Sequence, residues 1–167
     1  MKVKEIMTGE ARSCRPDTSL AAAAMFMWEE DCGVLPVVGD GERVVGMITD
    51  RDICMAVAMR PSPASEIPVS EIISHRVFSC SPEAEVHDAL KLMQEERVHR
   101  LAVVDGDGTL RGLLSLNDIV LEAKQAKGRK TTAVTYTDVV DTFKAICAHR
   151  SLPQVQSEPP EGQAATA

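Results

Sequence analysis

Along this chain, segments with the apolar spacing of a helix alternate with short apolar runs typical of strands. The same order of helical and strand segments occurs twice. After Pro16 and again after Pro82, apolar residues recur at intervals of three and four, which is typical of a helix with one buried face. Two short runs rich in β-branched residues follow each helical segment, with glycine- and aspartate-rich turns between them. The pattern predicts a helix, an antiparallel hairpin and a second helix in each copy. The predicted strands are residues 34–38, 44–48, 100–104 and 110–114.

The succession occurs twice because the chain contains an internal repeat. A shift of 66 positions aligns residues 3–54 with residues 69–120 without a gap, and 16 of these 52 pairs are identical. Unrelated segments do not stay in register through several turns and loops. The alignment therefore indicates a duplicated structural unit.

A single unit of about 60 residues buries only a marginal core, so the two copies need each other. We expect an α+β fold in which the copies bury their sheet faces against each other with pseudo-two-fold symmetry, forming two related clefts. Two prolines near position 61 end the first copy. The predicted organisation is a first domain at 1–60, a linker at 61–68, a second domain at 69–124, a basic linker at 125–135, a C-terminal helix at 136–150 and a disordered tail at 151–167.

Composition and charge narrow the classes of partner. The net charge of −7 argues against a nucleic-acid-binding surface, which needs a basic balance. The longest apolar run, residues 20–28, is too short to span a bilayer, and the first residues do not resemble a signal peptide. The five cysteines are odd in number and form no C-x-x-C motif. We therefore expect a cytoplasmic protein without a disulfide framework, a metal site, a nucleic-acid partner or a membrane partner.

Candidate chemistry concentrates where the second strand of each copy enters its second helix. The segments 46–52 and 112–118 each contain a glycine, two apolar residues, a hydroxyl residue (Thr49 or Ser115) and then an aspartate (Asp52 or Asp118). The strand delivers the hydroxyl to a helix N-terminus, where free backbone N–H groups and the positive dipole end favour an anion such as phosphate. The carboxylate three residues later can accept both hydroxyls of a ribose. The same spacing also matches a capping box, which is much the commoner meaning of this pattern.

The doubled pattern resembles a tandem pair of CBS domains, also called a Bateman module. The resemblance covers residues 1 to about 124 and rests on V-x-E-I-M near the start, the proline-led helix, L-P-V-V, and G-M-I-T-D-R-D. It is nearest to small stand-alone bacterial CBS-pair proteins of the hypoxic response protein type. The family implies a β-α-β-β-α unit, two units per module, and often two modules in a disk-shaped dimer.

The resemblance also implies an adenosine-containing ligand, held between the copies. By motif position, Asp52 and Asp118 would bind the ribose hydroxyls, and Thr49 and Ser115 would lie beside the ribose or phosphate. Arg51, which stands where the second copy has an asparagine, would add a cation to one cleft.

Further positions follow from the same resemblance. Val98 to Leu101 are similar to the V-H-R-L strands of the γ subunit of AMP-activated protein kinase, so that His99 and Arg100 match phosphate-contacting positions. The residues expected near the adenine or in the pocket walls are Ala11, Val77, Pro36 and Ala102.

These observations predict a non-enzymatic regulatory module with no obligatory cofactor. It would bind AMP, ADP, ATP, S-adenosylmethionine or NAD, and would signal through a homodimer or an unidentified protein target. The alternative is a structural dimerisation or protein-interaction module with empty clefts. A third hypothesis is a redox or hydrolytic enzyme that uses a histidine or a cysteine such as Cys14 or Cys80, but no base stands at a recognisable spacing from either thiol.

Overall fold

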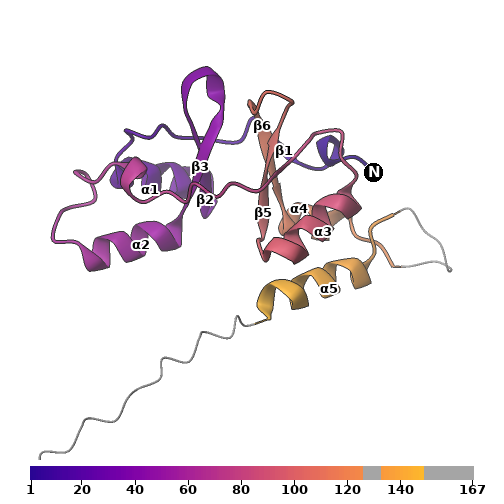
Figure 1. Cartoon of the computed structure of the whole chain (residues 1–167). Helices are drawn as coiled ribbons and strands as arrows, with labels where there is room; N and C mark the ends of the chain where they lie inside the picture. Colours follow the sequence, from indigo (N-terminus) through magenta and orange to yellow (C-terminus); the bar gives the residue numbers. More distant parts are fainter. Residues whose placement is uncertain (126–132, 149–167) are drawn as a thin grey trace, which may run out of the picture.

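The computed structural model describes residues 1–125 and 133–148 and places the two repeats side by side (Figure 1). The predicted tail at 151–167, most of the predicted basic linker and the last two residues of the predicted C-terminal helix lie outside the described residues. No helix within the two described ranges combines the length and hydropathy that a membrane crossing requires.

Each repeat contains two helices that flank an antiparallel hairpin, as the sequence pattern predicts. The first repeat holds α1 (Leu20–Glu29), β2 (Val34–Val38), β3 (Val44–Thr49) and α2 (Asp50–Met59). The second repeat holds α3 (Val86–Glu96), β5 (Arg100–Val104), β6 (Leu110–Ser115) and α4 (Leu116–Glu122). The shorter elements are the strands β1 (Thr8–Gly9) and β4 (Ser79–Cys80) and the 3-10 helices η1 (Val3–Glu5), η2 (Asp40–Glu42) and η3 (Val69–Glu71).

The two hairpins have the same register, which confirms the duplication in three dimensions. Val37 pairs with Gly46 in the first hairpin, and Val103 pairs with Gly112 in the second, 66 positions later. The pairing register shifts directly after each of these pairs. Equal registers follow from equal hydrophobic alternation, because a slip of one residue would turn the core-facing side chains outward.

An exchange of N-terminal segments joins the repeats. Val3 is fully buried in the core of the second repeat, whereas Val69 is fully buried in the core of the first. The Val3 amide donates to the carbonyl of Ala84 at 3.0 Å, and the Val69 amide donates to the carbonyl of Thr18 at 2.8 Å. The N-terminus therefore lies beside the second repeat (Figure 1). The buried residues form two clusters, and each cluster is completed by a segment from the other repeat.

A backbone contact lies on the pseudo-two-fold axis itself. Arg43 forms an antiparallel bridge with Thr109, which is its own counterpart 66 positions later. Residues that are equivalent under a two-fold rotation can pair directly only where the axis passes between them. Next to this bridge, the Val44 amide donates to the carbonyl of Gly108 at 3.1 Å.

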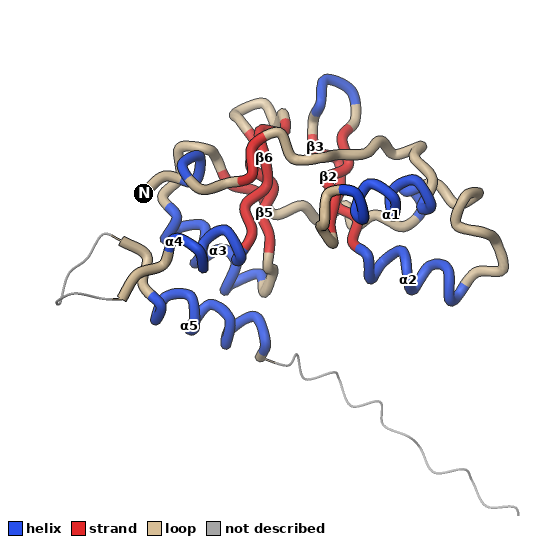
Figure 2. The backbone as a smooth tube through the Cα atoms, turned by 180° about the vertical axis from the view of Figure 1, so that it is seen from behind, coloured by secondary structure: helices blue, strands red, loops and turns tan. Residues whose placement is uncertain are grey.

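The C-terminal helix α5 (Tyr136–Cys147) lies against the second repeat. It packs against α3 and α4, and Val139 and Ile146 contact the core of that repeat. The Gln94 amide group donates to the hydroxyl of the fully buried Thr142 at 2.7 Å. Figure 2 shows α5 below α3 and α4.

Candidate functional site

A cleft of about 390 Å³ lies where the first repeat meets the second. One wall is the segment Thr8–Arg12, which runs from β1 toward α1, and another is the turn from Glu30 to Val34 at the end of α1. The second repeat contributes the start of β5 and the junction between β6 and α4. The residues from this repeat are Arg100, Leu113, Ser115, Asn117 and Asp118.

The junction is built as a helix cap. The amide and the hydroxyl of Ser115 both donate to Oδ2 of Asp118 at 2.7 Å, and the Asp118 amide donates to Oγ of Ser115 at 3.2 Å. Thr49 and Asp52 form the same reciprocal cap at the start of α2. The capping interpretation is therefore confirmed in both repeats.

The cap leaves Asp118 available for a second role. Its three hydrogen bonds with Ser115 use Oδ2 and the backbone amide, so Oδ1 takes no part in the cap. Asp118 is half-buried and lines the cleft, and the cap holds its carboxylate in one orientation. A carboxylate fixed in this way is a preorganised acceptor for hydroxyl donors such as those of a ribose.

The structure brings four of the predicted site residues together in this cleft: Ala11, Arg100, Ser115 and Asp118. Asp52, Thr49 and Arg51 stand at the corresponding junction of the first repeat and do not line it.

The other predicted residues lie apart from the cleft. Pro36 and Ala102 are buried within β2 and β5, and Val77 is half-buried before β4. His99 lies beside α5, where its ring meets the ring of Phe143 edge-on, with the ring centres 6.1 Å apart. A neighbouring cavity of about 270 Å³ is lined by these two rings and by Arg100, Ser115 and Asn117, so the end of α5 adjoins the cleft.

Several cleft residues were not singled out from the sequence. Arg12 extends over the ring of Phe26 on α1, with the guanidinium carbon 4.2 Å from the ring centre, and this contact positions its charge at the cleft. Asp31 adopts a left-handed conformation with φ 47° at the turn that ends α1. Arg12 and Asp31 have no identical partner under the 66-residue shift, because the second copy has phenylalanine and arginine there. The repeat alignment therefore gave no signal for them.

The charges that line the cleft are mostly acidic. Two guanidinium groups, those of Arg12 and Arg100, face four carboxylates. These carboxylates belong to Glu10, Glu30, Asp31 and Asp118. A ligand with several negative charges would therefore meet more repulsion here than a ligand with one phosphate or with none.

Of the cysteines named in the enzyme hypothesis, Cys14 is buried and Cys80 is half-buried. Burial raises the pKa of the Cys14 thiol and of the Cys80 thiol to about 11 each, so both are protonated near neutral pH. In the part of the chain that the structure describes, no three side chains of histidine, cysteine, aspartate or glutamate form a group that could hold a metal ion.

Comparison with known proteins identifies the fold family. The model of the CBS domain matches residues 3–59 and 69–124. The CBS domain-containing protein YhcV of Bacillus subtilis is 30% identical over 139 residues, which cover 82% of this chain and 97% of YhcV. Hypoxic response protein 1 of Mycobacterium tuberculosis is 30% identical over 152 residues, which cover 89% of this chain and 96% of that protein.

Solved structures agree with this family. The crystal structure of Hypoxic Response Protein I, which holds two coordinated zinc ions, matches with a TM-score of 0.67 and 27% identity, covering 74% of this chain and all of that chain. The structure of CBSX2 in complex with AMP matches with a TM-score of 0.62 and 25% identity, covering 72% of this chain and 93% of that chain.

Proposed function

Because this chain belongs to the CBS-domain family and carries two copies of the domain, we propose that it is a non-catalytic regulatory module that binds an adenosine-containing ligand between its repeats. The site is the cleft lined by Ala11, Arg100, Ser115, Asn117 and Asp118. The observation that carries the proposal is the orientation of Asp118, which lines the cleft while its cap occupies only one carboxylate oxygen. The AMP bound by the related protein CBSX2 supports the ligand class.

Each group in the cleft has a separate task in this proposal. Oδ1 of Asp118 accepts hydrogen bonds from the ribose hydroxyls, while Oδ2 stays in the cap. Arg100 and Arg12 neutralise the phosphate, because their guanidinium groups present donors that match phosphate oxygens. The segment around Ala11 lies beside the adenine.

The charge balance of the cleft selects among the candidate ligands. Four carboxylates against two guanidinium groups disfavour a triphosphate, and neither His99 nor Arg51 lines the cleft to offset its charge. AMP therefore binds more tightly than ATP, and S-adenosylmethionine, whose sulfonium is positive, is also compatible with this site.

Calorimetry with AMP, ATP, S-adenosylmethionine and NADH tests the proposal, with Asp118→Ala and Asp52→Ala as a matched pair. Both variants remove the same cap, which costs about 1 kcal/mol of stability. Only Asp118→Ala weakens the binding of AMP, by at least tenfold, because Asp52 does not line the cleft.

Two outcomes oppose the proposal. If none of the four compounds binds below about 1 mM, where binding is worth only about −4 kcal/mol, the module does not sense this ligand class. If the two aspartate variants lose the same stability and show the same change in AMP affinity, Asp118 acts only as a cap. If no nucleotide changes the melting temperature, the result favours the alternative, an interaction module with empty clefts.

The setting of the module follows from its chemistry. All five cysteines are free, as is usual in a reducing compartment, which supports a cytoplasmic location. We take the output of ligand binding to be a changed contact with a second copy or with a target protein. The ligand shifts this contact only by the difference between its affinities for the two states.

A further inference from the structure

A second cavity borders the cleft, between the start of β5, the start of α4 and helix α5. It has a volume of about 270 Å³, and two aromatic rings line it, those of His99 and Phe143. The cavity and the cleft have three lining residues in common, which are Arg100, Ser115 and Asn117. The two spaces are therefore neighbours, and Arg100 stands at their boundary.

The Phe143 ring is only partly covered by the protein. Val139 and Ile146, which lie four residues before it and three residues after it on α5, pack against the core of the second repeat. The Phe143 side chain, in contrast, is 50% exposed. A bound ring that covers it would gain the free energy of apolar burial. The matches of the CBS-domain model end at residue 124, so Phe143 reaches this cavity from outside both domains.

The ring of His99 is held at a fixed place beside Phe143. The His99 carbonyl accepts a hydrogen bond from the Leu116 amide at 2.9 Å, which ties the start of β5 to the start of α4. The two rings meet edge-on, with their centres 6.1 Å apart and their planes at 70°. Rings in this arrangement leave flat faces for a third ring, which packs against them at centre distances of about 4.5–7 Å. The cavity therefore suits a planar aromatic group.

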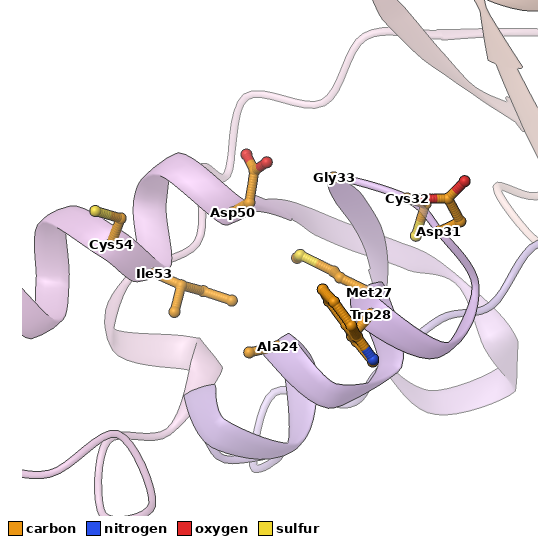
Figure 3. A pocket seen from close by; sticks show the side chains of 9 residues that line it. All are labelled: Ala24, Met27, Trp28, Asp31, Cys32, Gly33, Asp50, Ile53 and Cys54. Atoms are coloured by element: carbon orange, nitrogen blue, oxygen red, sulfur yellow. The ribbon is translucent and has the colours of Figure 1, made fainter.

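The corresponding positions of the first repeat carry different chemistry. Where the second repeat has His99 and Arg100, the first has Gly33 and the buried Val34. Gly33 lines a groove between α1 and α2 together with Asp50, whose amide donates to the Gly33 carbonyl at 3.2 Å (Figure 3). This part of the first repeat thus presents a carboxylate, whereas the second presents an imidazole ring and a guanidinium group. The aromatic cavity is a property of the second repeat and not of the repeated unit.

The cleft and the cavity together suit a ligand larger than a mononucleotide. Ligand pockets usually measure about 300–1,000 Å³, and the two spaces, at about 390 and 270 Å³, each lie near the lower end of this range. A ligand that reaches from Ala11 to Phe143 needs a nucleoside for the cleft, a phosphate linker beside Arg100 and a second ring for the cavity. A dinucleotide has these three parts in this order.

The charges around the two spaces favour a dinucleotide whose second ring is positive. Carboxylates outnumber guanidinium groups in the cleft, and the residues that line the cavity include no carboxylate. In NAD⁺ the positive nicotinamide ring offsets one of the two phosphate charges, so NAD⁺ brings less negative charge to the site than ADP-ribose, which lacks this ring. A positive ring against the face of Phe143 also gains a cation–π attraction.

We propose that this cavity is a second compartment of the ligand site, which holds the second aromatic ring of a dinucleotide against His99 and Phe143. The adenosine lies in the cleft, the two phosphates lie beside Arg100, and helix α5 supplies one wall of the compartment. This inference rests on the proposed function and deepens it, because it names the ligand class and adds a binding residue from outside the two CBS domains.

Calorimetry with AMP, ADP-ribose and NAD⁺ on the full chain tests the proposal, with Phe143→Ala and Tyr136→Ala as a matched pair. ADP-ribose differs from NAD⁺ only by the nicotinamide ring, so the ratio of the two affinities measures the contribution of that ring. NAD⁺ binds at least tenfold more tightly than ADP-ribose, which corresponds to about 1.4 kcal/mol. Phe143→Ala removes this difference and leaves the affinity for AMP unchanged. Tyr136→Ala preserves the difference, because this 57% exposed aromatic residue of the same helix does not line the cavity.

The outcomes distinguish a failure of this inference from a failure of the proposed function. If AMP binds, but NAD⁺ binds no more tightly than ADP-ribose, the proposed function stands and the second compartment is refuted. The compartment is also refuted if Phe143→Ala weakens AMP and NAD⁺ equally, or if Tyr136→Ala removes the difference as well, since α5 then acts through its fold. If neither AMP nor NAD⁺ binds below about 1 mM, the proposed function itself fails. Circular dichroism confirms that both variants are folded, as expected for substitutions of exposed side chains.

Discussion

Truncation of Val3 to alanine tests whether the N-terminal segment belongs to the core of the second repeat. The residue stands almost at the start of the chain, where a substitution is usually tolerated. Its side chain is nevertheless fully buried among residues of the second repeat. Removing two buried carbon groups costs about 0.8 kcal/mol each, and incomplete collapse of the cavity adds to this. We therefore expect a loss of about 2 kcal/mol.

Urea unfolding followed by circular dichroism measures this loss, and a matched control isolates its cause. Val45→Ala removes the same groups from a 39% exposed site on β3 and should cost less than about 1 kcal/mol. Hydrogen exchange locates the effect. Val3→Ala should lower the protection of amides in β5 and β6, whereas Val69→Ala, its counterpart, should lower the protection of amides in β2 and β3.

The reasoning fails on either of two results. A loss below about 0.5 kcal/mol for Val3→Ala would mean that the segment is not packed in solution. A larger loss of exchange protection in β2 and β3 than in β5 and β6 would mean that the segment packs on its own repeat instead.

Three further predictions concern the pairing of β1 with β6, the cap of α5 and the burial of Cys14. Gly112→Ala places a Cβ against the backbone carbonyl of Thr8 and should detach β1 from β6, which lowers the melting temperature by several degrees. Gly106→Ala is the control, because open space surrounds that position. Equal shifts of the melting temperature in the two variants would contradict the pairing of β1 with β6. The pKa of Asp138 is lowered from its ordinary value of 3.8, because the hydrogen bonds from Thr135 outweigh the opposing effect of burial. The ionised carboxylate therefore stabilises α5 above about pH 4. This contribution should disappear as the pH falls further, and Asp138→Asn should abolish that part of the pH dependence of unfolding. Because burial raises the pKa of the Cys14 thiol to about 11, iodoacetamide at pH 8 should label the exposed cysteines first. Mass spectrometry measures the labelling rate of each cysteine. A rate for Cys14 equal to that of the exposed cysteines would refute its burial.

Local patterns were enough to predict most elements of this fold. The hairpins and helices lie where hydrophobic alternation and helical spacing predict them. Each element buries one face, so its buried residues recur in the sequence with the period of a strand or of a helix. The caps at Thr49 and Ser115 follow for the same reason, since a capping box needs only a hydroxyl residue and an acidic residue three positions apart. The 66-residue repeat predicted that both copies would share these features.

The tertiary structure decided what no local pattern contains. Val3 and Val69 are identical partners in the repeat, so their sequence context alone does not say which core each one enters. The cleft at Asp118 also depends on this choice, because the exchanged segment that leads to Arg12 forms one of its walls. Helix α5 packs against α3 and α4, and there Gln94 donates to Thr142 of α5 at a position where the first repeat has Trp28. In each case a segment packs on one of two nearly equivalent surfaces. Which surface it packs on depends on contacts between residues far apart in the chain.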